Sequence, residues 1–142
     1  MKTMIRIAIA AAAIATAGTA AAEDWNPISR SSQYIYLADG DSVVQTGNDT
    51  TIKVARAPVA GSSRAYRVQT YAFNCADQRF RLVRTAEYDN GAEMDAYDED
   101  GAEYEAVPRN SLIESIKEVA CDGNRADPPT WPSMAAYLAS LR

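Results

Sequence analysis

Alternation of apolar and polar side chains over most of the chain predicts β-strands. In residues 79–89, "RFRLVRTAEYD", Phe80 and Leu82 share one face while Arg79 and Arg81 share the other, as a half-solvated antiparallel strand requires. Turn signals rich in Gly, Asn and Asp separate the runs, and the first of these is Asp39-Gly40. The runs that we interpret as strands are 32–39, 42–45, 50–59, 64–75, 79–89, 92–97 and 102–107. Together they predict an antiparallel β-sheet of about six strands.

The hydrophobic period changes after Pro108 and predicts an α-helix over 111–121, "SLIESIKEVAC". Its first turn carries an S-x-x-E capping box, in which Ser111 and Glu114 bond reciprocally to backbone N–H groups. The apolar residues that this period places on one helical face are Leu112, Ile113, Ile116, Val119 and Ala120. We expect this helix to pack on one face of the sheet, which gives an α+β fold.

Residues 122–142 form a Pro-rich linker followed by a short helical pattern. The apolar residues of that pattern recur at i, i+3, i+4 and i+7, and they are Met134, Tyr137, Leu138 and Leu141. Such a stripe either docks back on the domain or binds a partner, and we favour docking. The expected organisation is therefore a signal peptide over 1–22, one α+β domain over 23–121 and a linker with a short C-terminal helix over 122–142.

The N-terminus has the order of a secretory signal peptide. Lys2 and Arg6 precede an Ile/Ala run, and small residues follow it up to Ala22, where an A-x-A site predicts cleavage (Ala20 is the alternative). No cysteine near this site offers a lipid anchor. We expect an exported protein, periplasmic or secreted, without a stable membrane anchor.

The formal net charge of −5 becomes more negative once the two basic residues of the signal peptide are removed. An acidic surface repels phosphate groups, so nucleic acid and anionic membrane surfaces are excluded as partners. A protein partner, or a second copy of the chain in a homodimer, remains.

Cys75 and Cys121 are the two cysteines of the chain. An oxidising compartment favours a disulfide between them over free thiols or over a catalytic or metal-binding role. Closing a loop of this length would stabilise the fold by about 3–4 kcal/mol. Because Cys121 ends the expected helix, the bridge would fasten that helix to the sheet.

Catalytic patterns are sparse. The sequence has no histidine, which removes Ser-His-Asp and Cys-His arrangements, and neither Lys53 nor Lys117 belongs to an S-x-x-K motif. A pair of carboxylates could support hydrolysis, but the sequence singles out no such pair. We expect no catalytic residues, no cofactor and no enzyme activity.

Charges are segregated along the chain. Residues 87–105 hold nine acids and no basic residue. This segment does not match an EF-hand loop, so a solvated acidic edge is the favoured interpretation and a weak cation site is the alternative. Arginines gather just upstream, and they are Arg56, Arg64, Arg67, Arg79, Arg81 and Arg84. The layout predicts cross-strand ion pairs, and it also suits protein recognition or self-association.

Several motifs occur in an order that resembles the surface-adhesin protein E family of bacterial exported proteins. They are "YIYLADGDSV", "TTIKVARAPV", "YAFNCADQRFRLV" and "VPRNSLIESIKEVAC", within residues 25–121. The resemblance implies a small antiparallel sheet with a C-terminal helix, fastened by a disulfide that maps onto Cys75 and Cys121. It also implies adhesion to host matrix and plasma proteins. This chain lacks the N-terminal lipid-anchor cysteine of the best-known type of member.

The function that we predict is therefore a non-enzymatic, exported module that binds a host or envelope protein through its sheet or charged hairpins. The alternative is a soluble periplasmic protein that binds a small ligand or a cation, or acts in a stress response, through the acidic hairpins of residues 87–105.

Overall fold

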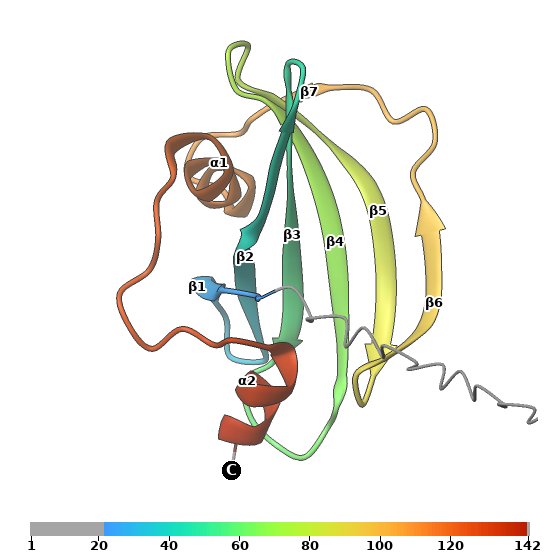
Figure 1. Ribbon diagram of the computed structural model, residues 1–142, viewed down its shortest axis with the longest axis vertical. Helices are drawn as coiled ribbons and strands as arrows, with labels where there is room; N and C mark the ends of the chain where they lie inside the picture. The colour runs from blue at the N-terminus through green and yellow to red at the C-terminus, as the bar shows by residue number, and fades with distance from the viewer. Residues whose placement is uncertain (1–21, 142) are drawn as a thin grey trace, which may run out of the picture.

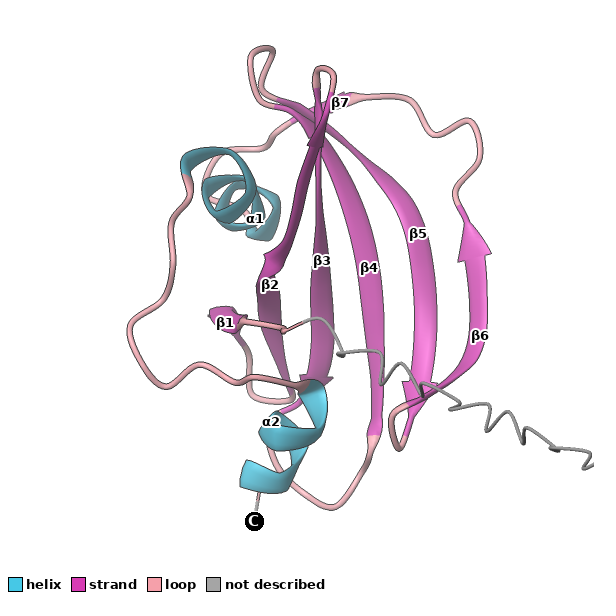
Figure 2. Cartoon of the chain, viewed as in Figure 1, coloured by secondary structure: helices cyan, strands magenta, loops and turns pink. Residues whose placement is uncertain are grey.

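The structure is a computed structural model that describes residues 22–141. Most of the predicted signal peptide 1–22 lies outside the described residues. The chain forms one sheet with two helices beside it (Figures 1 and 2). The strands are β1 (Trp25–Arg30), β2 (Tyr34–Thr46), β3 (Asp49–Pro58), β4 (Ala65–Asn74), β5 (Arg79–Asp89), β6 (Ala92–Asp98) and β7 (Glu105–Ala106). The helices are α1 (Leu112–Asp122) and α2 (Met134–Ser140).

The sheet is an antiparallel meander, as the alternation predicted. Strands β1 to β6 lie in sequence order, and each pairs antiparallel with the next. The short β7 returns to the same edge of β5 that β6 occupies, where Arg79 pairs with Ala106 and Phe80 with Glu105. The predicted strand over 102–107 is thus reduced to two residues.

Strand β1 is not among the predicted strands, because its residues do not alternate. Trp25 and Asn26 are both buried, and Pro27 interrupts the pattern. The outer edge of β1 is partly covered by the linker, since the N–H groups and carbonyls of Trp25 and Trp131 bond to each other at 2.9 and 3.1 Å. Tertiary pairing, not local pattern, makes this strand.

The turn predicted at Asp39-Gly40 is wrong. Strand β2 continues through it, with an irregularity between Asp39 and Val44 where the register with β3 shifts. The Ser42 hydroxyl donates to the Asp39 carbonyl at 2.7 Å and accepts from the Lys53 N–H at 2.9 Å. These bonds satisfy backbone groups that the interrupted ladder leaves free, so the chain bends here without reversing.

The two helices lie on opposite faces of the sheet. Neighbouring residues of a strand point to opposite faces, and Leu37 packs in the cluster with α2 while Ala38 packs in the cluster with α1. In Figure 1, α1 lies beside the upper end of the sheet and α2 beside its lower end. Each helix therefore covers one half of one face.

Helix α1 begins and is fastened as the sequence predicted. Ser111 is its N-cap and accepts from the Glu114 N–H at 3.1 Å, but the Glu114 carboxylate reaches the N–H of Asn110, one residue before the expected partner. Cys121 in its last turn forms a disulfide with Cys75, which follows β4. The predicted helical face is the buried one, with Leu112 and Ile113 at its margin.

Helix α2 docks on the domain. Met134, Tyr137 and Leu138 are buried against Trp25 and Leu37, and Leu141 packs at the edge of the same cluster. The Tyr137 hydroxyl also donates to the Pro58 carbonyl at 2.7 Å. The apolar residues of the C-terminal helix therefore pack against the sheet, as the sequence favoured.

Candidate functional site

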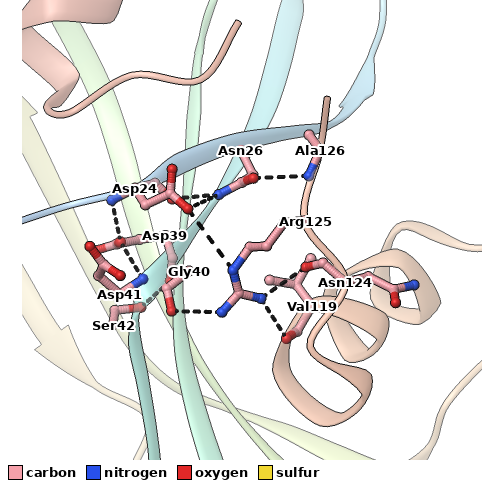
Figure 3. Close-up of polar contacts among 10 residues, drawn as sticks. All are labelled: Asp24, Asn26, Asp39, Gly40, Asp41, Ser42, Val119, Asn124, Arg125 and Ala126. Atoms are coloured by element: carbon pink, nitrogen blue, oxygen red, sulfur yellow. Dashed lines mark hydrogen bonds and ion pairs between the residues drawn. The ribbon is translucent and has the colours of Figure 1, made fainter. Parts of the chain in front are cut away.

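Two polar regions of the molecule are candidates for a functional site, and the first surrounds Arg125. This residue of the linker reaches back between β2 and the C-terminal end of α1 (Figure 3). Its guanidinium donates to the carbonyls of Gly40 at 3.1 Å, Val119 at 3.2 Å and Asn124 at 2.8 Å, and its Nε lies 3.9 Å from a carboxylate oxygen of Asp24. A cation at the C-terminal carbonyls of a helix is favourable, because those carbonyls lack helical partners.

Buried polar side chains complete this cluster. Asn26, 1% exposed, donates to Asp24 and accepts from the Ala126 N–H at 2.9 Å, and Asp39 accepts from the N–H groups of Asp24 and Asp41 (Figure 3). In residues 22–141, every buried side-chain nitrogen or oxygen has a hydrogen-bond partner. The Arg125 cluster is thus internally satisfied, and its role is to hold the linker against β2 and α1.

The second region lies on the face of the sheet against which α1 packs, which we call the α1 face. It is the half of that face that α1 does not cover. We call it the open half-face and define it by Tyr34, Arg56, Arg67, Glu87, Asp95 and Tyr97. The strand registers place all six side chains on one face. Among residues 22–141, the helices pack elsewhere, α1 over the half of this face that holds Ile52 and Phe73 and α2 on the opposite face.

Its charges form one row across the sheet. Arg56 of β3 lies directly opposite Arg67 of β4, Arg67 opposite Glu87 of β5, and Glu87 opposite Asp95 of β6. The row reads two positive charges and then two negative charges. Arg67 and Glu87 form an ion pair, with their side chains 35% and 40% exposed. The cross-strand pairing that the sequence predicted is therefore present at the middle of the row.

Arg56 is held differently. Its guanidinium lies over the ring of Tyr34, 4.5 Å from the ring centroid, a cation–π arrangement. Within the part of the chain that the structure describes, no carboxylate lies within ion-pair distance of Arg56. A hollow of about 390 Å³ opens beside it. The residues that line this hollow include Tyr34, Arg56, Pro58, Ala65, Arg67 and the acidic Glu87.

Large exposed apolar side chains also mark this part of the surface. Tyr34 is 38% exposed at the β2 end of the open half-face, and Tyr97 is 49% exposed at its β6 end. Met94, 67% exposed, lies on the same edge strand β6. Val44, 54% exposed, lies elsewhere, in the last part of β2.

Some acids of residues 87–105 form ion pairs with arginines, and the others face solvent. Besides the Glu87 pair, Glu93 and Asp98 both contact Arg84, at 3.1 and 2.9 Å. The hydrogen bond that Arg84 donates to Asp98 is the main reason that the pKa of Arg84 is raised. In the described residues, no three His, Cys, Asp or Glu side chains lie close enough together to hold a metal ion. The acidic edge that the sequence favoured therefore includes three acids that form ion pairs with arginines of β4 and β5, namely Glu87, Glu93 and Asp98.

Two further upstream arginines hold the loop before β7, whereas Arg64 precedes β4 and its carbonyl accepts from the Asn90 N–H at 3.2 Å. Arg79 donates to the Tyr104 carbonyl at 2.8 Å, and the guanidinium of Arg81 lies 5.4 Å from the centroid of the Tyr104 ring. The Tyr104 hydroxyl bonds to the carboxylate of Asp49. The sequence pointed to these arginines as a group, but it gave no sign that Arg56 alone would stack on Tyr34. That arrangement depends on which residues of β2 and β3 meet.

Comparison with known proteins places these features in a family context. The family model described as surface-adhesin protein E matches residues 25–122, a segment that contains the whole sheet, α1 and both cysteines. No curated protein and no solved structure gives a significant match. Within residues 22–141, neither helix has the length and apolar character needed to cross a membrane.

Proposed function

Because the chain belongs to the surface-adhesin protein E family, we propose that it is an exported, non-enzymatic module that binds a protein partner through the open half-face. The family supports an adhesin-like role at the surface or outside the cell. The sequence supports export through its N-terminal signal pattern, and it supports the lack of catalysis through the missing histidine and the missing S-x-x-K motif.

The observation that carries this proposal is the composition of the open half-face. Protein–protein interfaces are enriched in tyrosine, methionine and arginine, which supply large contact areas and directional hydrogen bonds. Tyr34 and Tyr97 stand exposed at its two ends, Met94 lies on its edge strand, and Arg56 and Arg67 lie between. Together these side chains give the open half-face the composition of a protein–protein interface.

The test compares two exposed side chains of similar accessibility. The full chain is expressed in a bacterium, and the exported protein is presented to a panel of purified extracellular-matrix and plasma proteins, with a reduced and unfolded sample as control. We expect a partner that binds only the folded form. Tyr97→Ser should weaken that binding by about tenfold or more if Tyr97 is an anchor.

Val44→Ser is the matched control, because Val44 is as exposed as Tyr97 but lies outside the open half-face. It should leave the affinity unchanged. Equal losses in Val44→Ser and Tyr97→Ser, or equal binding by the unfolded sample, would contradict the proposed surface. Mass measurement of the exported protein tests cleavage after Ala22 in the same preparation.

A further inference from the structure

We propose that Arg56 and Arg67, with Tyr34, form a carboxylate-binding site that takes an Asp or Glu side chain of the protein partner. This inference rests on the proposed function and deepens it, because it names the chemistry that the partner must present. It commits to a protein segment that presents a single carboxylate and not to a polyanionic polysaccharide.

The charges of the row are unbalanced at its Arg56 end. Like charges directly opposite each other on neighbouring strands destabilise a sheet, yet Arg56 and Arg67 occupy such a pair of positions. Arg67 is neutralised by Glu87 on its other side. Arg56 has no acidic partner in residues 22–141. An incoming carboxylate beside Arg56 would turn a repulsive pair into an alternating one.

Arg56 is held in an orientation that suits a carboxylate. Stacking on the Tyr34 ring removes much of the conformational freedom of this long side chain before any ligand arrives. Its guanidinium donates no hydrogen bond to any other group in residues 22–141. A planar guanidinium with free N–H groups matches a carboxylate in a two-bond, fork-like geometry.

The hollow beside Arg56 is large enough to hold a side chain of a partner. The hollow of about 390 Å³ lies within the usual size range of ligand pockets. Tyr34, Pro58 and Ala65 supply apolar wall next to the two guanidinium groups. The polar residues Gln33, Ser63 and Glu87 also line the hollow, and Glu87 is already paired with Arg67. Arg56 is therefore the cation of this wall that has no acidic partner in residues 22–141.

The rest of the row selects a protein segment over a polyanion. Glu87 and Asp95 continue the row on the far side of Arg67, so a chain with repeated negative charges would meet repulsion within two strands. The net charge of −5 adds to that repulsion. The complementary partner presents one carboxylate at Arg56 and cationic or aromatic groups toward Asp95 and Tyr97.

The experiment is a titration of the isotopically labelled, exported protein, followed by the side-chain N–H signals of its arginines. The probes are the capped peptide acetyl-Ala-Tyr-Glu-Tyr-Ala-amide, its twin with Gln in place of Glu, and a heparin-derived hexasaccharide. We expect the Glu peptide to shift the Arg56 Nε–H signal and the Gln peptide to leave it unchanged. A hexasaccharide that binds more tightly than the Glu peptide, or equal shifts with both peptides, would overturn the proposal.

Variants assign the effect to the site. Arg56→Gln should weaken binding of the Glu peptide by about tenfold or more, since it removes a charge-assisted pair of hydrogen bonds. Arg56→Lys keeps the charge but loses the fork and should recover only part of the affinity. Arg109→Gln is the matched control, because it removes an exposed arginine in the segment before α1, and it should have no effect.

The partner found with the folded protein separates the two proposals. If Tyr97→Ser abolishes capture while Arg56→Gln does not, the open half-face binds the partner and the carboxylate site is wrong. If neither change weakens capture, both proposals are wrong. Thermal unfolding of each variant verifies that the fold is intact.

Discussion

The two halves of the α1 face lie on the same strands, but one half has apolar side chains and the other has charged and aromatic ones. The covered half holds Ile52, Tyr71, Phe73 and Phe80 under α1, and Ile52 and Phe73 are fully buried. The open half-face holds Arg56, Arg67 and Glu87 on the same strands β3, β4 and β5, and its exposed tyrosines lie at its ends on β2 and β6. One disulfide fastens the helix over the first half. Of these two halves, the covered one contributes to the stability of the fold, and the open one stays accessible to a partner.

The largest expected effect comes from breaking the covered half. Phe73 has no exposed surface and its ring lies 6.2 Å from that of Phe80. Phe73→Ala should lower the free energy of unfolding by about 3–5 kcal/mol, because it leaves a cavity under α1. Urea-induced unfolding measures this change. Tyr97→Ala on the open half-face is the comparison, and we expect it to change stability by no more than about 0.5 kcal/mol; similar losses in both variants would contradict the division into two halves.

This division shows what the sequence could and could not predict. The alternating strands, the capped helix and the disulfide pairing all follow from local patterns or from family resemblance, and the structure confirms the antiparallel sheet, the helix and the Cys75–Cys121 disulfide. Strand β1 was missed because its pairing with β2 and its burial of both Trp25 and Asn26 depend on tertiary contacts.

The open half-face could not be found from the sequence either. Its charges are scattered over four strands, and only the registers bring Arg56, Arg67 and Glu87 into one row. A shift of one residue in any pair would send the same side chains to the opposite face. The segregation of arginines and acids was the available signal, but it did not say which of them would meet.

A second, smaller effect is expected at the attachment of the linker. A Cβ added at Gly40 would overlap with Nε of Arg125, so Gly40→Ala must displace that side chain. The displaced guanidinium loses its bonds to the carbonyls of Gly40 and Val119. We expect a loss of about 1–3 kcal/mol in the free energy of unfolding.

A double-mutant cycle sharpens this prediction. Arg125→Ala alone should cost about 1–2 kcal/mol. In the Arg125→Ala background, Gly40→Ala should cost much less than it does in the native chain, because the side chain that it would displace is gone. Additive losses would show that Gly40 is required for another reason.

The covered half should also lose stability in alkali, through Tyr71. Burial, and secondarily the nearby Tyr36, raises the pKa of Tyr71 above the usual tyrosine value of about 10. Because the folded state holds this proton more tightly than the unfolded state, the contribution is fully present below pH 10 and is lost as the pH rises above it. Urea unfolding between pH 8 and pH 11, about the titration range of tyrosine, should show the loss, and Tyr71→Phe should reduce it. An equal alkaline loss in Tyr71→Phe would contradict this origin.

The smallest effect on stability is expected where the proposed function is concentrated. Glu87 pairs with Arg67, but both side chains are more than a third exposed, and exposed ion pairs contribute about 0–1 kcal/mol. Glu87→Gln should therefore leave urea unfolding nearly unchanged. It also leaves Arg67 and Arg56 as an unneutralised pair beside the hollow, so a carboxylate ligand should bind more tightly, by up to about tenfold at low salt, and the gain should shrink as the ionic strength rises. Titration of the variant with the Glu peptide measures the change. A large loss of stability would mean that the charged row belongs to the fold, and the two halves of the face would then not be divided between stability and recognition.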